Sequence, residues 1–77
     1  MRTMTEIAER IGIDPNVRSG QPVVYGTRVT VDLVLDQLAS GMTPDEVAEA
    51  YKITREDVLA CIRFAKQEIS HHRYGVA

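Results

Sequence analysis

The sequence predicts a mainly α-helical domain in which a bundle of three helices follows a short β-hairpin or extended arm. Three observations predict this fold class. A helix-start signal occurs three times in residues 29–58, apolar residues recur at helical spacing after each signal, and the first 28 residues are interrupted by glycine and proline. We expect the 77 residues to form one domain, with the arm at 1–29, the bundle at 30–72 and a tail at 73–77.

The helix-start signal is an apolar residue, a threonine and, four positions after the threonine, a valine. The three copies are Val29-Thr30 with Val34, Met42-Thr43 with Val47, and Ile53-Thr54 with Val58. The threonine can cap the helix while the apolar residue before it packs on the valine, which is the hydrophobic staple. Glu46 and Asp57 stand where the second and third signals need a capping-box partner, and Pro44 occupies a first helical position.

Apolar spacing assigns one core face to each helix. The expected faces are Val31, Val34, Leu35 and Leu38 in the first helix, Val47, Ala48 and Tyr51 in the second, and Val58, Ile62, Ala65 and Ile69 in the third, which is expected over residues 55–72. Leu33 and Phe64 lie nearly opposite these faces. Because a small domain gains stability from further burial, we expect Leu33 and Phe64 to contact another chain.

The arm is less regular than the bundle. Its apolar residues stand among Pro15, Gly20, Pro22 and Gly26, which predicts short extended segments separated by turns. Residues 4–10 can alternatively begin a short helix, and the sequence does not separate the two interpretations.

Composition and charge limit the classes of function. The chain has a net charge of −2, and residues 31–53 hold five carboxylates against the single Lys52. A dedicated nucleic-acid binder usually has a basic face, so this balance argues against tight DNA binding by a monomer. No apolar run approaches the roughly 18 residues of a membrane helix, and no signal-peptide core is present, so we expect a cytoplasmic protein without a membrane partner.

The stretch GQPVVYGTRVTV at residues 20–31 has the glycines of a phosphate-binding loop without its spacing. Thr27-Arg28 stands where a Walker loop needs lysine and serine or threonine, and the Rossmann glycine pattern is absent. A structural interpretation fits better. Gly20 and Gly26 permit turns, Pro22 holds the preceding residue extended, and the second turn leads into the cap of the first helix. Arg28 is then placed to pair with an acidic group or a partner.

The chain resembles the "domain of unknown function 433" family over roughly residues 11–66. The resemblance rests on residues 20–31 and on three further runs, which are Ile13-Asp14-Pro15, Gly41-Met42-Thr43-Pro44-Asp45-Glu46-Val47 and Thr54-Arg55-Glu56-Asp57-Val58. The resemblance implies a homeodomain-like helix-turn-helix bundle behind a short β arm, a homodimer, and a role as antitoxin to a PIN-like ribonuclease. The motif positions that it carries over are Gly20, Pro22, Gly26, Thr27 and Arg28, each in a turn or in contact with a partner.

The second and third helices have the proportions of a helix-turn-helix, whose recognition helix contacts bases with its N-terminal residues. Here that end reads Arg55, Glu56 and Asp57, and DNA would repel the two carboxylates. Arg55, Arg63 and Lys66 are candidate phosphate contacts, although solvated charges on a helix face are the favoured explanation for them.

No catalytic or metal constellation is evident. His71 and His72 are adjacent and cannot face the same way on a helix, and Cys61 has no neighbouring base. We therefore expect a protein that is not an enzyme and needs no cofactor. The favoured hypothesis is an antitoxin-like protein that neutralises a ribonuclease toxin and that can also regulate its own operon. It would inhibit the toxin either by covering the toxin's substrate groove or by pairing Arg28 or Arg73 with the toxin's acidic residues. The alternative is a stand-alone helix-turn-helix transcriptional regulator.

Overall fold

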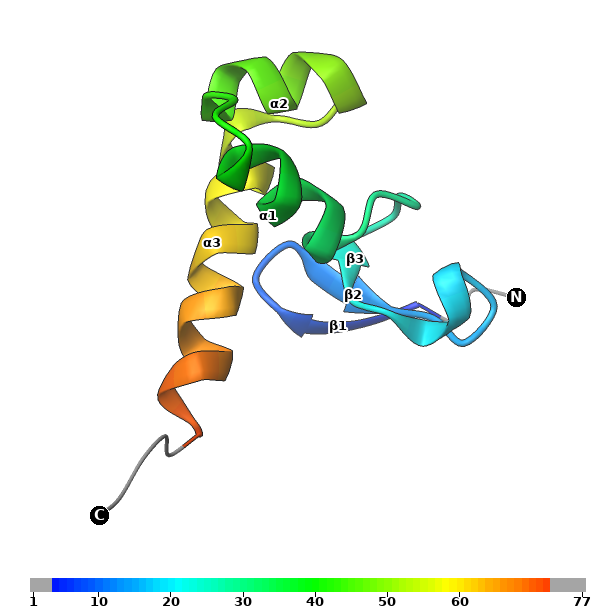
Figure 1. Cartoon of the computed structure of the whole chain (residues 1–77). Helices are drawn as coiled ribbons and strands as arrows, with labels where there is room; N and C mark the ends of the chain where they lie inside the picture. The colour runs from blue at the N-terminus through cyan, green and yellow to red at the C-terminus, as the bar shows by residue number, and fades with distance from the viewer. Residues whose placement is uncertain (1–3, 73–77) are drawn as a thin grey trace.

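The computed structural model describes residues 4–72 and contains a three-stranded sheet followed by three helices (Figure 1). The strands are β1 (Thr5–Ala8), β2 (Ile11–Ile13) and β3 (Val23–Val24), and a short 3-10 turn, η1 (Arg18–Gly20), precedes β3. The helices are α1 (Val31–Ala39), α2 (Pro44–Tyr51) and α3 (Arg55–Ser70). The predicted fold class is confirmed: a helix-turn-helix bundle follows a β arm.

The arm is an antiparallel sheet in the order β1-β2-β3. Glu6 faces Gly12 and Ala8 faces Ile11, so Ile7 is an extra residue that bulges from the edge strand. The alternative of a short helix at residues 4–10 is therefore wrong. The strand forms because β2 supplies hydrogen-bonding partners that a local sequence pattern does not reveal.

All three predicted helix starts are confirmed. The hydroxyls of Thr30, Thr43 and Thr54 accept hydrogen bonds from the backbone N–H groups three residues later, and Glu46 and Asp57 complete capping boxes in α2 and α3. The apolar residues before the three threonines pack on the core, as the hydrophobic staple requires. Local side-chain chemistry thus fixes where each helix begins.

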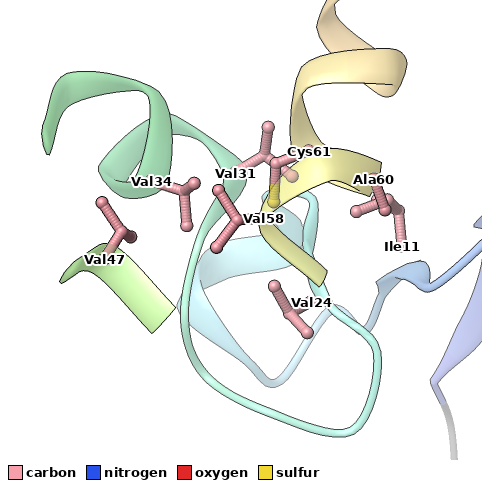
Figure 2. Packing of buried hydrophobic residues seen from close by; sticks show 8 residues of the cluster. All are labelled: Ile11, Val24, Val31, Val34, Val47, Val58, Ala60 and Cys61. Carbon is pink, nitrogen blue, oxygen red and sulfur yellow. The ribbon is translucent and has the colours of Figure 1, made fainter. Parts of the chain in front are cut away.

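The core joins the helices to the sheet. Figure 2 shows its buried residues, which are Ile11, Val24, Val31, Val34, Val47, Val58, Ala60 and Cys61. The faces predicted for the first and second helices are confirmed, because their remaining members pack against this cluster.

The face predicted for the third helix is wrong in part. Ile62 and Ile69 are 40% and 60% exposed, whereas Ala60 and Cys61 are buried. The sheet explains the difference, because β2 packs on α3 and Ala60 lies beside Ile11 (Figure 2), where only a small side chain leaves room for the strand. Phe64, expected to point outward, is half-buried and packs against the core.

The helical part of α3 ends at Ser70, with His71 as its C-cap, two residues before the expected end. Its C-terminal end projects away from the sheet and the other two helices (Figure 1). The predicted tail at 73–77, with Arg73 as a candidate contact to a nuclease, lies outside the described residues.

Candidate functional site

Four of the five motif positions build the turns of the arm. Gly20 and Gly26 have positive φ values of 79° and 80°, which side chains rarely allow. The carbonyl of Pro22 accepts a hydrogen bond from the N–H of Val31, 3.0 Å away. The Thr27 hydroxyl donates to the carbonyl of Val24 over 2.8 Å and accepts from the N–H of Val29. These four residues position the chain that enters α1.

Arg28, the fifth motif position, is exposed and forms no ion pair with any residue in the range 4–72. It lines a polar cleft beside η1, where Arg18 contributes a second guanidinium. The structure thus places Arg28 in the lining of the same cleft as Arg18, a cation that the sequence motif did not identify.

The N-terminal end of α3 is already engaged within the molecule. Arg55 Nε lies 3.3 Å from Asp45 Oδ1 at the start of α2. Asp57 accepts the N–H of Thr54 through one oxygen and the guanidinium of Arg10 through the other, at 2.9 and 3.0 Å. Arg10 lies in the β1–β2 turn with φ of 67°, so this contact ties the arm to the recognition-helix position.

These contacts set the protonation state of Asp57. Burial by itself raises its pKa, but hydrogen bonds from the Thr54 backbone, Arg10 and the Thr54 hydroxyl, together with the charge of Arg10, outweigh burial and hold the pKa below its usual value of 3.8. Asp57 is therefore ionised at neutral pH. It places a negative charge where a recognition helix would approach DNA.

The other two candidate DNA contacts lie farther along α3. Arg63 Nη2 is 3.7 Å from Glu9 Oε1, and both side chains are largely exposed. Lys66 is exposed and lines a groove with Arg63. Of the three cations, two have carboxylate partners, so the helix presents little uncompensated positive charge.

Two grooves flank Phe64, one on each side of α3. The first, of about 500 Å³, lies between α1 and α3 and is lined by apolar side chains and two carboxylates. The apolar lining residues are Pro22, Val31, Leu35, Phe64, Ala65 and Ile69, the carboxylates are those of Asp32 and Glu68, and Gln21 completes the lining. We call it the α1–α3 groove.

The second groove, of about 600 Å³, lies between β1 and α3 and is called the β1–α3 groove. Ile7 and Ile62 supply its exposed apolar surface, and Arg63 and Lys66 stand beside it. Leu33 is half-buried and lines neither groove, whereas Phe64 lines both. Contact of these two residues with another chain stays a prediction.

Cys61 is fully buried, and burial, followed by the nearby charge of Asp57, raises the pKa of its thiol to about 11. The thiolate that a nucleophile requires is therefore scarce at neutral pH. Among residues 4–72, no three histidine, cysteine, aspartate or glutamate side chains converge to hold a metal ion. None of the helices described is long and apolar enough to span a membrane.

Sequence reasoning missed the two grooves, Arg10 and Arg18. A weak signal for the grooves existed in the chain, since Ile62 and Ile69 occupy one stripe of α3 and the small residues Ala60 and Cys61 occupy another. The Arg10–Asp57 pair joins residues 47 positions apart and left no local pattern.

Comparison with known proteins agrees with this architecture. The crystal structure of Rv2018 from Mycobacterium tuberculosis superposes with a TM-score of 0.69 and 28% sequence identity, covering 80% of this chain and 31% of that one. The similarity therefore extends over about a third of Rv2018. No curated protein matches the chain. The model of the family "Protein of unknown function (DUF433)" matches residues 11–65, which include the turns at Gly20 and Gly26 and most of the bundle, and the chain therefore belongs to the DUF433 family.

Proposed function

We propose that this protein is antitoxin-like and that it binds and neutralises a PIN-like ribonuclease toxin. The observation that carries the proposal is the α1–α3 groove, where apolar side chains share the lining with Asp32 and Glu68. A ribonuclease needs a basic surface to hold the phosphates of its substrate. A groove with exposed apolar area and carboxylates in its lining is complementary to such a surface.

The two components of the groove have different roles in this proposal. Burial of Ile69 and its apolar neighbours provides most of the binding free energy, because desolvated apolar anchors dominate protein interfaces. Asp32 and Glu68 orient the toxin and speed its association, since charge complementarity acts chiefly on encounter and specificity. The toxin's RNA-binding groove is then covered and its substrate excluded.

Paired substitutions test the proposal. We expect Glu68→Lys and Ile69→Asp to abolish capture of the ribonuclease by the tagged, full-length chain. Glu49→Lys is the matched control, because Glu49 is likewise an exposed acid near the end of a helix and lies outside the α1–α3 groove. If Glu68→Lys and Glu49→Lys retain the ribonuclease equally, the α1–α3 groove is not its binding site.

A stand-alone DNA-binding regulator is the second candidate. The observation that favours it is the packing of α2 on α3 across a three-residue turn, in which Lys52 adopts a left-handed conformation. The candidate contacts Arg55 and Arg63 would have to leave Asp45 and Glu9 to reach phosphates. A regulator should bind its operator with a steep salt dependence that falls when both arginines become alanine. No operator binding at low salt would eliminate this candidate, and also the idea that an antitoxin regulates its own operon.

We also infer that the protein is a homodimer and has no catalytic activity. The β1–α3 groove supports the first inference, because Ile7 and Ile62 remain 44% and 40% exposed in a domain too small to leave apolar area unused. A second copy of the chain is the expected occupant. Multi-angle light scattering should give twice the monomer mass for the native protein and the monomer mass for Ile62→Asp. A native monomer would contradict the inference.

A further inference from the structure

The polar cleft beside η1 has the composition of an oxyanion site. Its volume is about 470 Å³, and its lining combines Arg18 and Arg28 with the side chains of Asn16, Ser19 and Gln21. Among residues 4–72, no carboxylate lines the cleft and neither guanidinium forms an ion pair. Two cations and three neutral hydrogen-bonding side chains therefore share one cleft without an internal anion.

The backbone around the cleft is held in place before any ligand arrives. Arg18 and Ser19 have φ values of 51° and 58°, a left-handed conformation that residues other than glycine seldom adopt. Hydrogen bonds from Gly20 N to Val17 O and from Gln21 N to Arg18 O close the turn at 3.0 and 3.1 Å. Strained residues of this kind are concentrated at ligand sites, because the surrounding structure must maintain them.

The carboxylate of Asp14, which precedes the cleft residues in the chain, is engaged in the turn itself. Asp14 is 9% exposed, and its Oδ1 accepts the N–H of Asn16 over 2.9 Å. Asp14 is not part of the cleft lining. Its charge therefore supports the fold of the loop, while Arg18 and Arg28 face the cleft.

We propose that this cleft binds a phosphate monoester. A phosphate monoester carries a charge of about −1.5 to −2 at neutral pH and offers three acceptor oxygens, which matches two guanidinium groups better than a single carboxylate does. Binding through paired guanidinium groups differs from the backbone cradle of a Walker loop, whose sequence pattern is absent here. The cleft lies on the arm and adjoins the α1–α3 groove at Gln21, which lines both, whereas Arg18 and Arg28 line the cleft and neither groove along α3.

Amide chemical shifts of the full-length, isotope-labelled chain test the proposal. The probes are inorganic phosphate, a nucleoside monophosphate, and a short oligonucleotide with a 5′-phosphate or a 5′-hydroxyl, all at constant ionic strength with chloride as the balancing anion. We expect saturable shifts at residues 16–21 and 28 with every probe that carries a terminal phosphate. The 5′-hydroxyl oligonucleotide should bind more weakly than its phosphorylated counterpart.

Four substitutions make the test specific. Arg18→Asn keeps a residue that tolerates the left-handed conformation, and Arg28→Gln removes the second charge; each should weaken binding about tenfold or more, as expected for loss of a charge-assisted contact. Arg55→Gln is the matched control and should leave the affinity unchanged. Should Arg28→Gln alter the free protein's own spectrum, Arg28→Lys retains the charge and should give an intermediate affinity.

Several results would overturn the proposal. Shifts that rise linearly without saturation, or that chloride alone reproduces, would show a general salt effect. Equal binding of the 5′-phosphate and 5′-hydroxyl oligonucleotides would show that the cleft contacts phosphodiesters. Saturation by none of the phosphates would show that the cleft binds no phosphate monoester.

Discussion

Replacement of Asp57 by alanine should destabilise the protein more than loss of a helix cap alone, because this side chain has two roles. One carboxylate oxygen completes the capping box of α3 by accepting the N–H of Thr54, and the other accepts the guanidinium of Arg10 from the β1–β2 turn. The substitution therefore removes a local contact and a contact between the arm and the bundle at the same time.

The expected loss of unfolding free energy in Asp57→Ala follows from the exposure of each contact. Loss of a capping contact costs about 1 kcal/mol. The ion pair is half open to water, with the Arg10 side chain 43% exposed, so it adds only about 0.5 kcal/mol. The expected total is about 1.5 kcal/mol, out of the roughly 4–12 kcal/mol typical for a domain of this length. For such a small domain this lowers the melting temperature by about 6–12 °C.

The capping contribution and the ion-pair contribution are measured separately by thermal and denaturant unfolding of Asp57→Ala, Arg10→Gln and the double variant. Glu46→Ala is the control, because Glu46 completes the capping box of α2 by accepting the N–H of Thr43 over 2.8 Å and makes no ion pair with another described residue. We expect Asp57→Ala to exceed Glu46→Ala by about 0.5 kcal/mol, the value expected for the exposed pair. If the effects of Asp57→Ala and Arg10→Gln are simply additive, the ion pair does not couple the arm to the bundle.

The pH dependence gives an independent check. Because the folded protein holds the pKa of Asp57 below its unfolded value, the stabilisation is fully present above about pH 5 and is lost as the pH falls through the folded pKa. The difference in unfolding free energy between the native protein and Asp57→Ala should therefore shrink below about pH 4. A difference that stays constant down to pH 2 would refute the assigned role of the carboxylate.

Three further predictions concern buried and exposed positions. Cys61 should react with iodoacetamide far more slowly in the native state than in denaturant, because it is buried with a pKa of about 11; equal rates would show that the core opens readily. Gly12→Ala should destabilise the sheet by about 1–3 kcal/mol in thermal unfolding, because the new methyl group would lie 2.8 Å from Tyr25 Cδ1, and an unchanged melting temperature would contradict that packing. Ile69→Asp should change the unfolding free energy by less than about 0.5 kcal/mol, whereas Phe64→Asp should unfold much of the population; similar stabilities would place the two residues in equivalent environments.

The helix starts could be predicted from the sequence because every group involved lies within five residues. Thr43 and Glu46 exchange hydrogen bonds across three positions, and Met42 packs on the core beside them. The turns at Gly20 and Gly26 were predictable for the same reason, since each depends on a local backbone conformation.

The face of α3 could not be predicted, because its environment is formed by a strand more than 45 residues earlier in the chain. A stripe of isoleucines and a stripe of small residues both satisfy helical spacing, and only the approach of β2 decides that Ala60 and Cys61 are buried. The same distance in sequence conceals the pairing of Arg63 with Glu9. The candidate DNA contacts therefore looked free in the sequence, although two of the three have acidic neighbours in the fold.

The central claim is that this protein neutralises a ribonuclease, and release of nuclease activity tests it most directly. The tagged chain is captured from its native host, and RNA cleavage by the eluate is measured before and after mild denaturation strips the chain from its partner and the partner is refolded alone. The account predicts no cleavage in the intact complex, cleavage by the released partner, and renewed inhibition when the purified chain is added back. Cleavage at the same rate before and after stripping, or no inhibition on adding the chain back, would contradict the account.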